Sequence, residues 1–454
     1  MSAIQQHDRS GVHRPRLKRV RAHFRRAMGL SKRWASYDGR IPSDPISRES
    51  KQDMESIVVV SELTCPTPPL DSTPSVQRAL VVAQKGVYEL RDTHAVPELE
   101  DDTEVLIRTR AVGLNPIDWK SVAYNFCLPS FPWITGREMA GIVERVGSQV
   151  SHVKPGDRVW TSTYYRDVRA GCFQEYIVVP RHTVLPIPAD LSFEEAACLG
   201  VAALTASMAL WKWLSVQMPE VKAWTTESGR QDPQHSSDDS GYQSSLNRSS
   251  LLDGTQVQVE EPEEEWILIW GGSTVTGQFA TQIARLAGLK PITVCSSRTA
   301  KVSEEKGAEH VVIRDDREPS ALVEEISRVT KGRITRALDL VGPSTARLCL
   351  QACSTPSQRE TLGDRKVLFA PLAMMEDTDE VPDNITVEAV EMKRFVLDSE
   401  SALYGHTLND LIENKMLQLP ALEILDGGLD AVQAGLEIVR QGDRGGRKVV
   451  ITVQ

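Results

Sequence analysis

A glycine-rich run at Gly271–Gly277 has the composition and position of a phosphate-binding loop. It follows the apolar stretch Trp266–Trp270 and precedes Phe279–Ala287, where Phe279, Ile283 and Leu286 recur with helical spacing. Glycines let a backbone approach a pyrophosphate, and the N-terminus of the following helix offers free N–H groups and partial positive charge. Because the spacing is not G-x-G-x-x-G, the run taken alone also suits an ordinary strand-to-helix turn. The predicted cofactor contacts in this run are Gly272, Ser273, Thr274, Val275 and Thr276.

The segment after the next predicted strand indicates which cofactor the loop holds. The strand Pro291–Cys295 is followed by Ser296, Ser297, Arg298 and Thr299, with no carboxylate among them. NAD enzymes usually place Asp or Glu at the end of this strand to bind the ribose hydroxyls. A carboxylate would repel a 2′-phosphate, whereas an arginine and hydroxyl groups would bind it. The sequence therefore favours NADPH over NADH, and a solvated surface arginine is the alternative interpretation of Arg298.

The elements around these residues predict an α/β protein. From Trp266 onward, short apolar strands alternate with amphipathic helices, which is typical of a doubly wound parallel sheet. Further strands are expected at Val311–Ile313, Ala337–Val341 and Lys366–Leu372, and further helices at Val302–Gly307 and Pro319–Lys331. Before this region, Ser192 and Glu195 have the spacing of a capping box, which predicts a helix over Ala196–Trp213.

The first half of the chain has a different texture, in which short strands are separated by Gly and Pro turns. This texture predicts a β-rich unit of Greek-key or barrel type. A final strand at Lys448–Val453 is positioned to rejoin that unit. The strands of the first half are expected at Arg78–Ala83, Glu104–Arg110 and Phe173–Val179, with a turn leading into another strand at Val153–Trp160.

These patterns divide the chain into two domains and two irregular segments. We expect a disordered basic extension at 1–75 and a β-rich domain at 76–195, completed by 400–454. The nucleotide-binding domain is expected at 196–399. A serine-rich and acidic insertion at 217–265 interrupts it, and this insertion cannot bury enough apolar surface to order itself.

Charge and composition restrict the cellular partners. Residues 1–40 hold eleven Lys or Arg against two acids, a net charge of +9 in a chain of net charge −10. The acidic remainder argues against nucleic acid as a ligand, and the absence of a run of eighteen apolar residues argues against a membrane span. Seven scattered cysteines indicate reduced thiols and a cytoplasmic location. The basic arm is compatible with a solvated tail, a mitochondrial-type presequence or a patch for nuclear import or an anionic surface.

Three ordered motifs in the first half resemble the medium-chain dehydrogenase/reductase family. They are Ala111–Lys120, Gly136–Gly147 and Pro155–Val159. The resemblance implies a GroES-like domain joined to a Rossmann domain. Zinc enzymes of this family carry Cys where Asn115 stands and His where Arg137 stands, and this chain has no C-x2-C pair. No metal is therefore expected.

Within the family, the Asn-Pro-x-Asp-Trp-Lys and Gly-Gly-Ser-Thr-Val-Thr patterns resemble trans-acting enoyl reductases of fungal polyketide synthases and dehydrogenases of toxin clusters. Quinone oxidoreductases are the next most similar group. The resemblance implies that Lys120 is the active-site lysine and that Leu199–Ala206, with Thr205, lines the substrate site. It also implies cofactor contacts from Asn115, from Ser296–Thr299 and from the tail residues Lys448 and Val449. Arg314 stands where a Tyr beside the cofactor is usual.

The implied reaction is conjugate reduction of an enoyl thioester or enone by NADPH. Lys120 would stabilise the enolate or order the nicotinamide ribose, and Thr205 would donate a hydrogen bond. Tyr124, four residues after Lys120, or water would protonate the α-carbon. The expected substrate is carried on a polyketide synthase, and both a monomer and a homodimer are compatible with the sequence. An NADPH:quinone oxidoreductase and a non-catalytic NADPH-binding scaffold are the alternatives.

Overall fold

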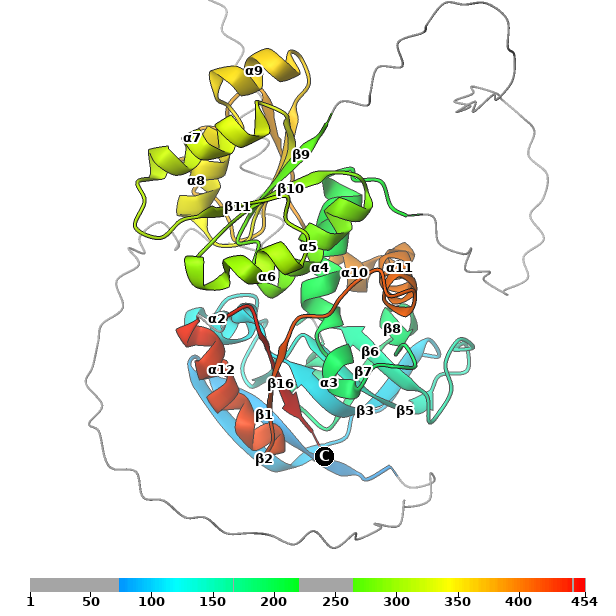
Figure 1. Ribbon diagram of the computed structural model, residues 1–454. Coiled ribbons are helices and arrows are strands. Elements are labelled where there is room, and N and C mark those ends of the chain that lie inside the picture. The colour runs from blue at the N-terminus through cyan, green and yellow to red at the C-terminus, as the bar shows by residue number, and fades with distance from the viewer. Residues whose placement is uncertain (1–72, 166, 220–263, 443–444, 454) are drawn as a thin grey trace, which may run out of the picture.

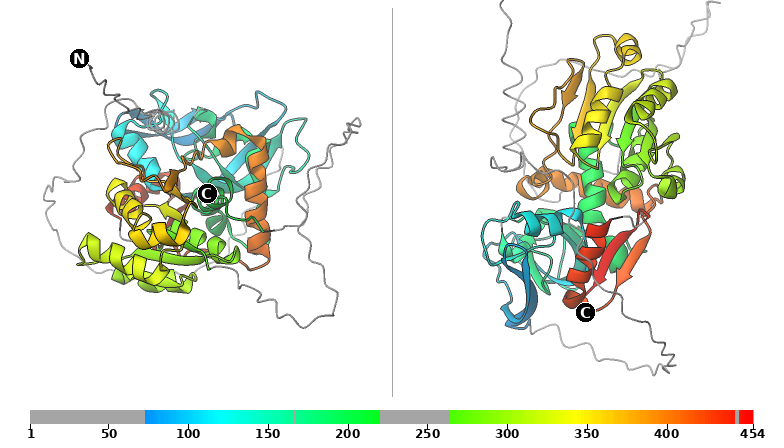
Figure 2. Two further views of the ribbon diagram at one scale, coloured as in Figure 1. Left: turned by 90° about the horizontal axis from the view of Figure 1, so that it is seen from above. Right: turned by 90° about the vertical axis from the view of Figure 1, so that its left-hand side faces the viewer.

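The computed structural model describes residues 73–165, 167–219, 264–442 and 445–453. The chain forms two units stacked on one another, with an antiparallel unit below and a parallel α/β unit above (Figure 1). A second view shows the same two units from the side (Figure 2). The predicted basic extension and serine-rich insertion lie almost entirely outside the described residues.

The lower unit is built on a seven-stranded sheet in the order β15-β16-β3-β5-β6-β8, with β7 also paired to β3. The C-terminal strand β16 runs antiparallel to β3, with Val450 opposite Gly113, so the end of the chain rejoins its first domain as the sequence predicted. A three-stranded sheet, β2-β1-β4, lies beside it. The strands are β1 (Val76–Gln84), β2 (Val87–Ala95), β3 (Glu104–Gly113), β4 (Trp133–Ile134), β5 (Glu138–Val146), β6 (Arg158–Ser162), β7 (Tyr176–Pro180), β8 (Val184–Pro186), β15 (Leu422–Leu425) and β16 (Lys448–Thr452).

The upper unit is a six-stranded parallel sheet in the order β11-β10-β9-β12-β13-β14 with helices packed against it. This arrangement confirms the predicted combination of an antiparallel GroES-like unit and a Rossmann-type parallel sheet. The strands are β9 (Trp266–Trp270), β10 (Lys290–Cys295), β11 (His310–Ile313), β12 (Ile334–Asp339), β13 (Val367–Pro371) and β14 (Ile385–Val387). The helices are α5 (Val275–Leu286), α6 (Ala300–Glu305), α7 (Pro319–Thr330), α8 (Pro343–Ala352) and α9 (Pro356–Leu362).

Two expectations about the upper unit were wrong in detail. Leu286 was expected on the buried face of α5, yet it is 41% exposed while Phe279 and Ile283 are buried. Leu286 is the last residue of α5, and the next residue, Ala287, packs against the core instead. The strand expected at Ala337–Val341 is β12, which ends at Asp339, and Val341 is 49% exposed in the turn that follows.

A long helical segment, Phe193–Trp213, runs between the two units. It begins with the predicted capping box, in which the hydroxyl of Ser192 accepts from the backbone N–H of Glu195. It consists of α3 (Phe193–Ala196), a π-helical turn at Leu199–Ala203, α4 (Leu204–Met208) and a second π-helical turn at Ala209–Trp213. By length and composition it is the one described helix apolar enough to cross a membrane, but 72% of its apolar window is buried inside the protein. It therefore packs as a core helix.

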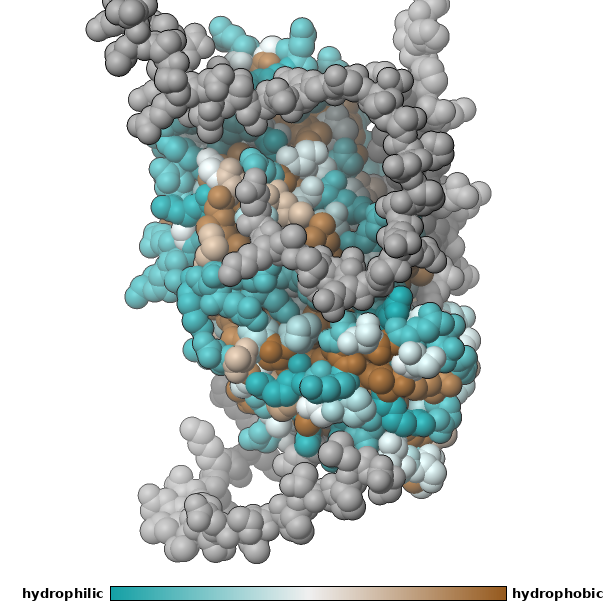
Figure 3. All heavy atoms as spheres, turned by 90° about the vertical axis from the view of Figure 1, so that its right-hand side faces the viewer, coloured by the Kyte–Doolittle hydropathy of each residue, from teal (hydrophilic) through white to brown (hydrophobic). Residues whose placement is uncertain are grey.

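One hydrophobic core joins the two units. It combines Trp160 of β6, Leu204 of α4 and Phe279 of α5 with residues of α11 (Ala402–Glu413). Polar contacts cross the same boundary, because Gln282 Nε2 donates to the carbonyl of Gln418 at 3.1 Å and the Gln418 N–H donates back to Gln282 Oε1 at 2.8 Å. On the side shown in Figure 3, hydrophilic residues surround a band of hydrophobic ones in the lower part of the molecule.

Candidate cofactor and active site

The glycine-rich loop lies at the carboxyl end of β9 and leads directly into α5. Gly271 has a φ of +90°, which favours glycine, and the hydroxyl of Thr274 caps the helix by accepting from the Gly277 N–H at 3.0 Å. A Cβ on Gly272 would lie 2.4 Å from Cβ of Thr293, so the loop backbone packs directly on β10. The loop thus presents the N-terminus of a twelve-residue helix, the arrangement that binds phosphate.

The hydroxyl groups after β10 come together with this loop. Thr299 Oγ1 donates to Ser273 Oγ at 2.9 Å, and Ser296 Oγ lies 2.9 Å from Thr299 Oγ1. The parallel pairing of β9 with β10 explains the contact, because it places the carboxyl ends of both strands at one edge of the sheet. Arg298 is exposed at the same edge. The structure therefore unites the two sequence segments predicted to bind the cofactor.

A carboxylate that sequence reasoning missed lies at this edge. Asp315 follows β11, and its Oδ2 accepts from both the backbone N–H and the hydroxyl of Ser297, each at 2.7 Å. Hydrogen bonds from Ser297 lower the pKa of Asp315, with a smaller contribution from neighbouring Arg314. Arg314 itself is exposed, and its backbone N–H donates to the carbonyl of Cys295 at 3.0 Å. The segment directly after β10 contains no acid, as the sequence shows, and the structure adds one from the neighbouring strand, since β11 is parallel to β10 and ends at the same edge.

The C-terminal tail reaches the phosphate loop through Gly446. Gln278 Nε2 donates to the carbonyls of Gly446 at 2.7 Å and of Ser273 at 3.0 Å. Gly446 has a φ of +78°, and a Cβ there would lie 2.6 Å from the carbonyl of Ser273. Val449, predicted to contact the cofactor, is 3% exposed in the core of the lower unit. Its side chain therefore packs within the protein, and the tail meets the loop three residues earlier.

Lys448 and Asn115 belong to a buried polar cluster of the lower unit. The ammonium of Lys448 pairs with Glu138 and donates to Asn115 Oδ1 at 2.8 Å. Asn115 Nδ2 donates to Glu138 Oε1 at 2.8 Å, and Glu138 Oε2 accepts from the Val201 N–H at 2.6 Å. Lys448 is 3% exposed and Glu138 is fully buried. These contacts join β16, β5 and the start of α2 (Pro116–Tyr124), and the cofactor contacts of Lys448 and Asn115 stay predictions.

A second buried cluster lies at the first turn of α2. Tyr165 Oη donates to Asp118 Oδ1 at 2.7 Å, and the Asn115 N–H donates to Asp118 Oδ2 at 2.8 Å. The guanidinium of Arg137 lies 4.3 Å from the ring centroid of Tyr165. Burial raises the pKa of Asp118 to about 6, although these hydrogen bonds oppose the shift. These contacts fix the first turn of α2, the helix that carries the predicted catalytic lysine.

The two positions compared with zinc ligands carry groups of the wrong chemistry for a cation. Asn115 contacts the ammonium of Lys448, and Arg137 is itself a cation. Positive charges at both places oppose the binding of a divalent metal ion. Within the described residues, no group of three or more His, Cys, Asp or Glu side chains is arranged to hold a metal.

The raised pKa of Asp118 predicts a specific pH dependence of stability. Its pKa in the folded state, about 6, lies above the ordinary unfolded value near 3.9, so its stabilising contribution is complete below about pH 4 and is lost as the pH rises through 6. The quantity to measure is the free energy of unfolding of the native protein minus that of Asp118→Asn, obtained with urea. We expect this difference to fall by on the order of 2 kcal/mol between pH 4.5 and 7. Parallel curves for the two proteins would contradict this assignment.

A control of opposite sign is available at Asp190. This carboxylate is exposed, and a hydrogen bond from Lys415 lowers its pKa. Its contribution is present above the unfolded pKa and lost as the pH falls. Asp190→Asn should therefore leave the pH 4.5–7 difference almost flat.

The predicted catalytic residues lie on the two elements that face the boundary between the units. Lys120 and Tyr124 are on α2, which Figures 1 and 2 place on the side of the lower unit that faces the parallel sheet. The ammonium of Lys120 lies 5.8 Å from the ring centroid of Trp119, whose ring is 6.0 Å from that of Tyr124. Thr205 is half-buried on α4, directly after a π-helical turn of the kind that often marks functional sites. Desolvation by the surrounding protein lowers the pKa of Lys120, although its side chain still reaches solvent.

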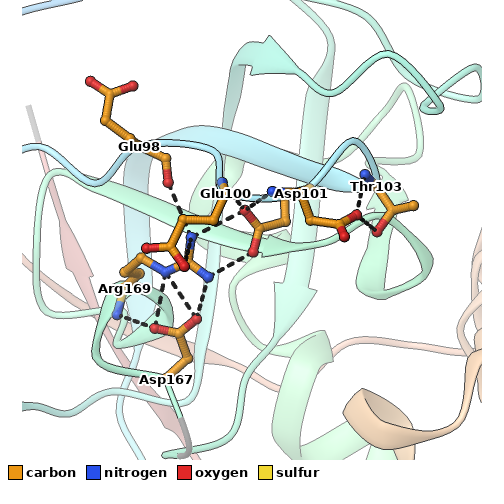
Figure 4. A network of polar contacts seen from close by, with 7 residues as sticks. Glu98, Glu100, Asp101, Thr103, Asp167 and Arg169 are labelled. Atoms are coloured by element: carbon orange, nitrogen blue, oxygen red, sulfur yellow. Dashed lines mark hydrogen bonds and ion pairs between the residues drawn. The ribbon is translucent and has the colours of Figure 1, made fainter.

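A charged network fixes the loop that follows Tyr165. Arg169 donates to Asp167, to Glu104 and to the carbonyl of Glu98 (Figure 4). The Arg169 and Glu104 side chains are only 18% and 13% exposed, so solvent screens this pair less than an open surface pair. The network therefore holds the segment 167–171 against the start of β3.

The stacked antiparallel and parallel units, with a glycine-rich loop at the carboxyl edge of the parallel sheet, define a two-domain protein whose parallel unit is of the nucleotide-binding type. Residues 101–189 match the model of the alcohol dehydrogenase GroES-like domain. The chain is 28% identical over 397 residues to the trans-enoyl reductase eqxC of Fusarium heterosporum, covering 83% of this chain and 99% of the relative. It is 27% identical over 401 residues to the trans-enoyl reductase traG of Penicillium crustosum, covering 84% and 98%.

Solved structures share the fold. The CurK enoyl reductase superposes with a TM-score of 0.62 at 20% identity, covering 83% of this chain and 99% of that one. The Escherichia coli quinone oxidoreductase complexed with NADPH superposes with a TM-score of 0.59 at 19% identity, covering 83% and 99%. Residues 101–189 thus match the GroES-like domain of alcohol dehydrogenases, and the chain as a whole is distantly similar to fungal trans-enoyl reductases and shares the fold of quinone oxidoreductases, as the medium-chain dehydrogenase/reductase resemblance implied.

Proposed function

We propose that this protein is an NADPH-dependent reductase of carbon–carbon double bonds conjugated to a carbonyl. Its substrate would be an enoyl thioester carried on a polyketide synthase of a secondary-metabolite pathway. The observation that carries the proposal is that the hydroxyl groups of Ser273, Ser296 and Thr299 are hydrogen-bonded to one another at the start of α5. Arg298 lies at the same edge of the sheet. The trans-enoyl reductases among its relatives support the choice of substrate class.

The residues present fit a dinucleotide. Close packing of the glycines against β10 and the open N-terminus of α5 suit a pyrophosphate, which backbone N–H groups would bind. The guanidinium groups of Arg298 and Arg314 and the hydroxyl of Ser296 suit a 2′-phosphate. When bound, NADPH supplies a hydride to the β-carbon of the substrate.

The chain's own residues would manage charge and protons. Addition at the β-carbon leaves negative charge on the carbonyl oxygen, which the ammonium of Lys120 and the hydroxyl of Thr205 are suited to stabilise. The phenol of Tyr124 or a water molecule would deliver the proton to the α-carbon. Asp118, buried and bound to Tyr165, holds the helix that carries Lys120 and needs no part in the proton transfer.

The test is a screen of NADPH consumption with enoyl thioesters, quinones and enals. We expect turnover of an enoyl thioester, and a loss of roughly 100-fold in kcat for Lys120→Ala, the usual effect of removing one charge-stabilising donor. Lys415→Ala is the matched control and should keep full activity. It also removes one lysine, but this lysine is exposed and pairs with Asp190.

A quinone oxidoreductase is the second candidate, favoured by the similarity of the fold to solved quinone oxidoreductases. Turnover of quinones together with inactivity on every enoyl thioester would replace the leading proposal with this one. Binding of NADPH without turnover of any acceptor would instead indicate a non-catalytic protein.

The lowered pKa of Lys120 also predicts the pH profile of turnover. If the ammonium is the active form, kcat falls as the pH rises through its pKa, which lies below the ordinary lysine value near 10.4 because the protein desolvates the charge. Lys120→Arg should move this alkaline limb upward beyond the measurable range, since a guanidinium stays protonated. An identical limb in both proteins would exclude Lys120 as its source.

A further inference from the structure

Asp315 and Ser297 form a contact at the place where the proposed cofactor's 2′-phosphate would lie. Ser297 is the second residue after β10, and its backbone N–H and its hydroxyl both donate to Asp315 Oδ2 at 2.7 Å. Ser297 begins a short 3-10 turn, Ser297–Thr299, that contains Arg298. The carboxylate therefore holds the segment that carries the predicted phosphate-binding arginine.

This contact acts on a 2′-phosphate in two ways. A phosphate at this edge needs hydrogen-bond donors, and the two donors of Ser297 are already bonded to Asp315. The carboxylate also carries a negative charge, which is favoured here because hydrogen bonds from Ser297 and the charge of Arg314 stabilise it. Like charges at a few ångströms repel each other even in water. Neither effect acts on NADH, which has a ribose hydroxyl in place of the phosphate.

Two cations oppose the carboxylate at the same edge. Arg298 directly follows Ser297, and Arg314 directly precedes Asp315. Both arginine side chains are exposed. The edge thus combines attraction from two guanidinium groups with repulsion from one carboxylate.

We infer that Asp315 is a specificity-determining residue that limits the preference of this protein for NADPH over NADH. The inference rests on the proposed function, because it assumes that a nicotinamide dinucleotide occupies this edge. It places after the neighbouring strand β11 a carboxylate that opposes a 2′-phosphate, which the sequence lacks directly after β10.

The test compares two asparagine variants of the full chain. Asp315→Asn removes the charge and keeps an oxygen that can accept from Ser297. Asp316→Asn removes the same charge one residue further on, at an exposed position with a φ of +53° that asparagine tolerates. Binding of NADP+ and of NAD+ is measured by calorimetry for both variants and for the native protein at one fixed salt concentration.

We expect Asp315→Asn to raise the affinity for NADP+ by roughly five- to twentyfold, with no gain for NAD+. Asp316→Asn should change the ratio of the two affinities by less than about twofold. An unchanged ratio in Asp315→Asn, or an equal change in both variants, would overturn this inference while leaving the proposed function intact. Failure of the native protein to bind either nucleotide would overturn the proposed function, and this inference with it.

Discussion

Replacing Lys448 by methionine is expected to lower the free energy of unfolding by about 3–5 kcal/mol, the usual cost of removing one partner of a buried ion pair. Glu138 is fully buried, and without Lys448 its carboxyl group would have only the N–H groups of Asn115 and Val201 as partners. Methionine fills a similar volume, so the loss arises from charge rather than from a cavity. Urea unfolding at neutral pH measures the change.

The double variant Glu138→Gln/Lys448→Met is the matched control. It removes both charges and leaves a neutral amide whose oxygen can still accept from the Val201 N–H. Replacing a whole buried pair is often nearly neutral, so we expect the double variant to recover all but about 1–2 kcal/mol of the loss. A double variant as unstable as Lys448→Met alone would show that the two residues are not energetically coupled.

The sequence was sufficient for the fold class because its signals are local. Alternating apolar strands and amphipathic helices predict a parallel sheet from period alone, and the strand Trp266–Trp270 was placed to the residue. The short edge strand β14 has only three residues, too few to show a period, and it was missed. Leu286 continued the helical period, but it is 41% exposed, and its neighbour Ala287 packs against the core in its place.

The site was predicted where neighbouring strands bring sequence segments together, and it was missed where side-chain direction decides. The contact between Ser273 and Thr299 follows from parallel pairing of successive strands. Asp315 follows β11, the strand beyond β10 in the sheet. Its contact with Ser297 depends on the course of the loop after β11, which the sequence pattern does not predict. Lys448 was predicted to contact the cofactor, and the sequence did not predict that its side chain pairs with the buried Glu138. Residue type alone does not predict such a pairing.

Gly277→Ala is expected to weaken NADPH binding by at least roughly 100-fold, because it disrupts the backbone that would hold the pyrophosphate. A Cβ at this position would lie 2.3 Å from the carbonyl oxygen of Gly271 and 2.7 Å from that of Gly272. Both contacts are with backbone atoms of the loop, so the first turn of α5 or the loop itself must move. The Thr274 cap, which accepts from the Gly277 N–H, would be displaced by the same movement.

Gly342→Ala provides the comparison that separates loop geometry from a general effect of added volume. Gly342 follows β12, the strand beside β9, and nothing lies within 4 Å of a Cβ built on it. Its φ of 167° is ordinary extended backbone. Alanine should therefore leave the stability nearly unchanged and the NADPH affinity within about twofold of the native value. The overpacked Gly277→Ala should also lose about 1–3 kcal/mol of stability, which thermal unfolding followed by circular dichroism measures. If Gly277→Ala is folded and binds NADPH as tightly as Gly342→Ala does, the loop is not the pyrophosphate site, and the cofactor must be held elsewhere.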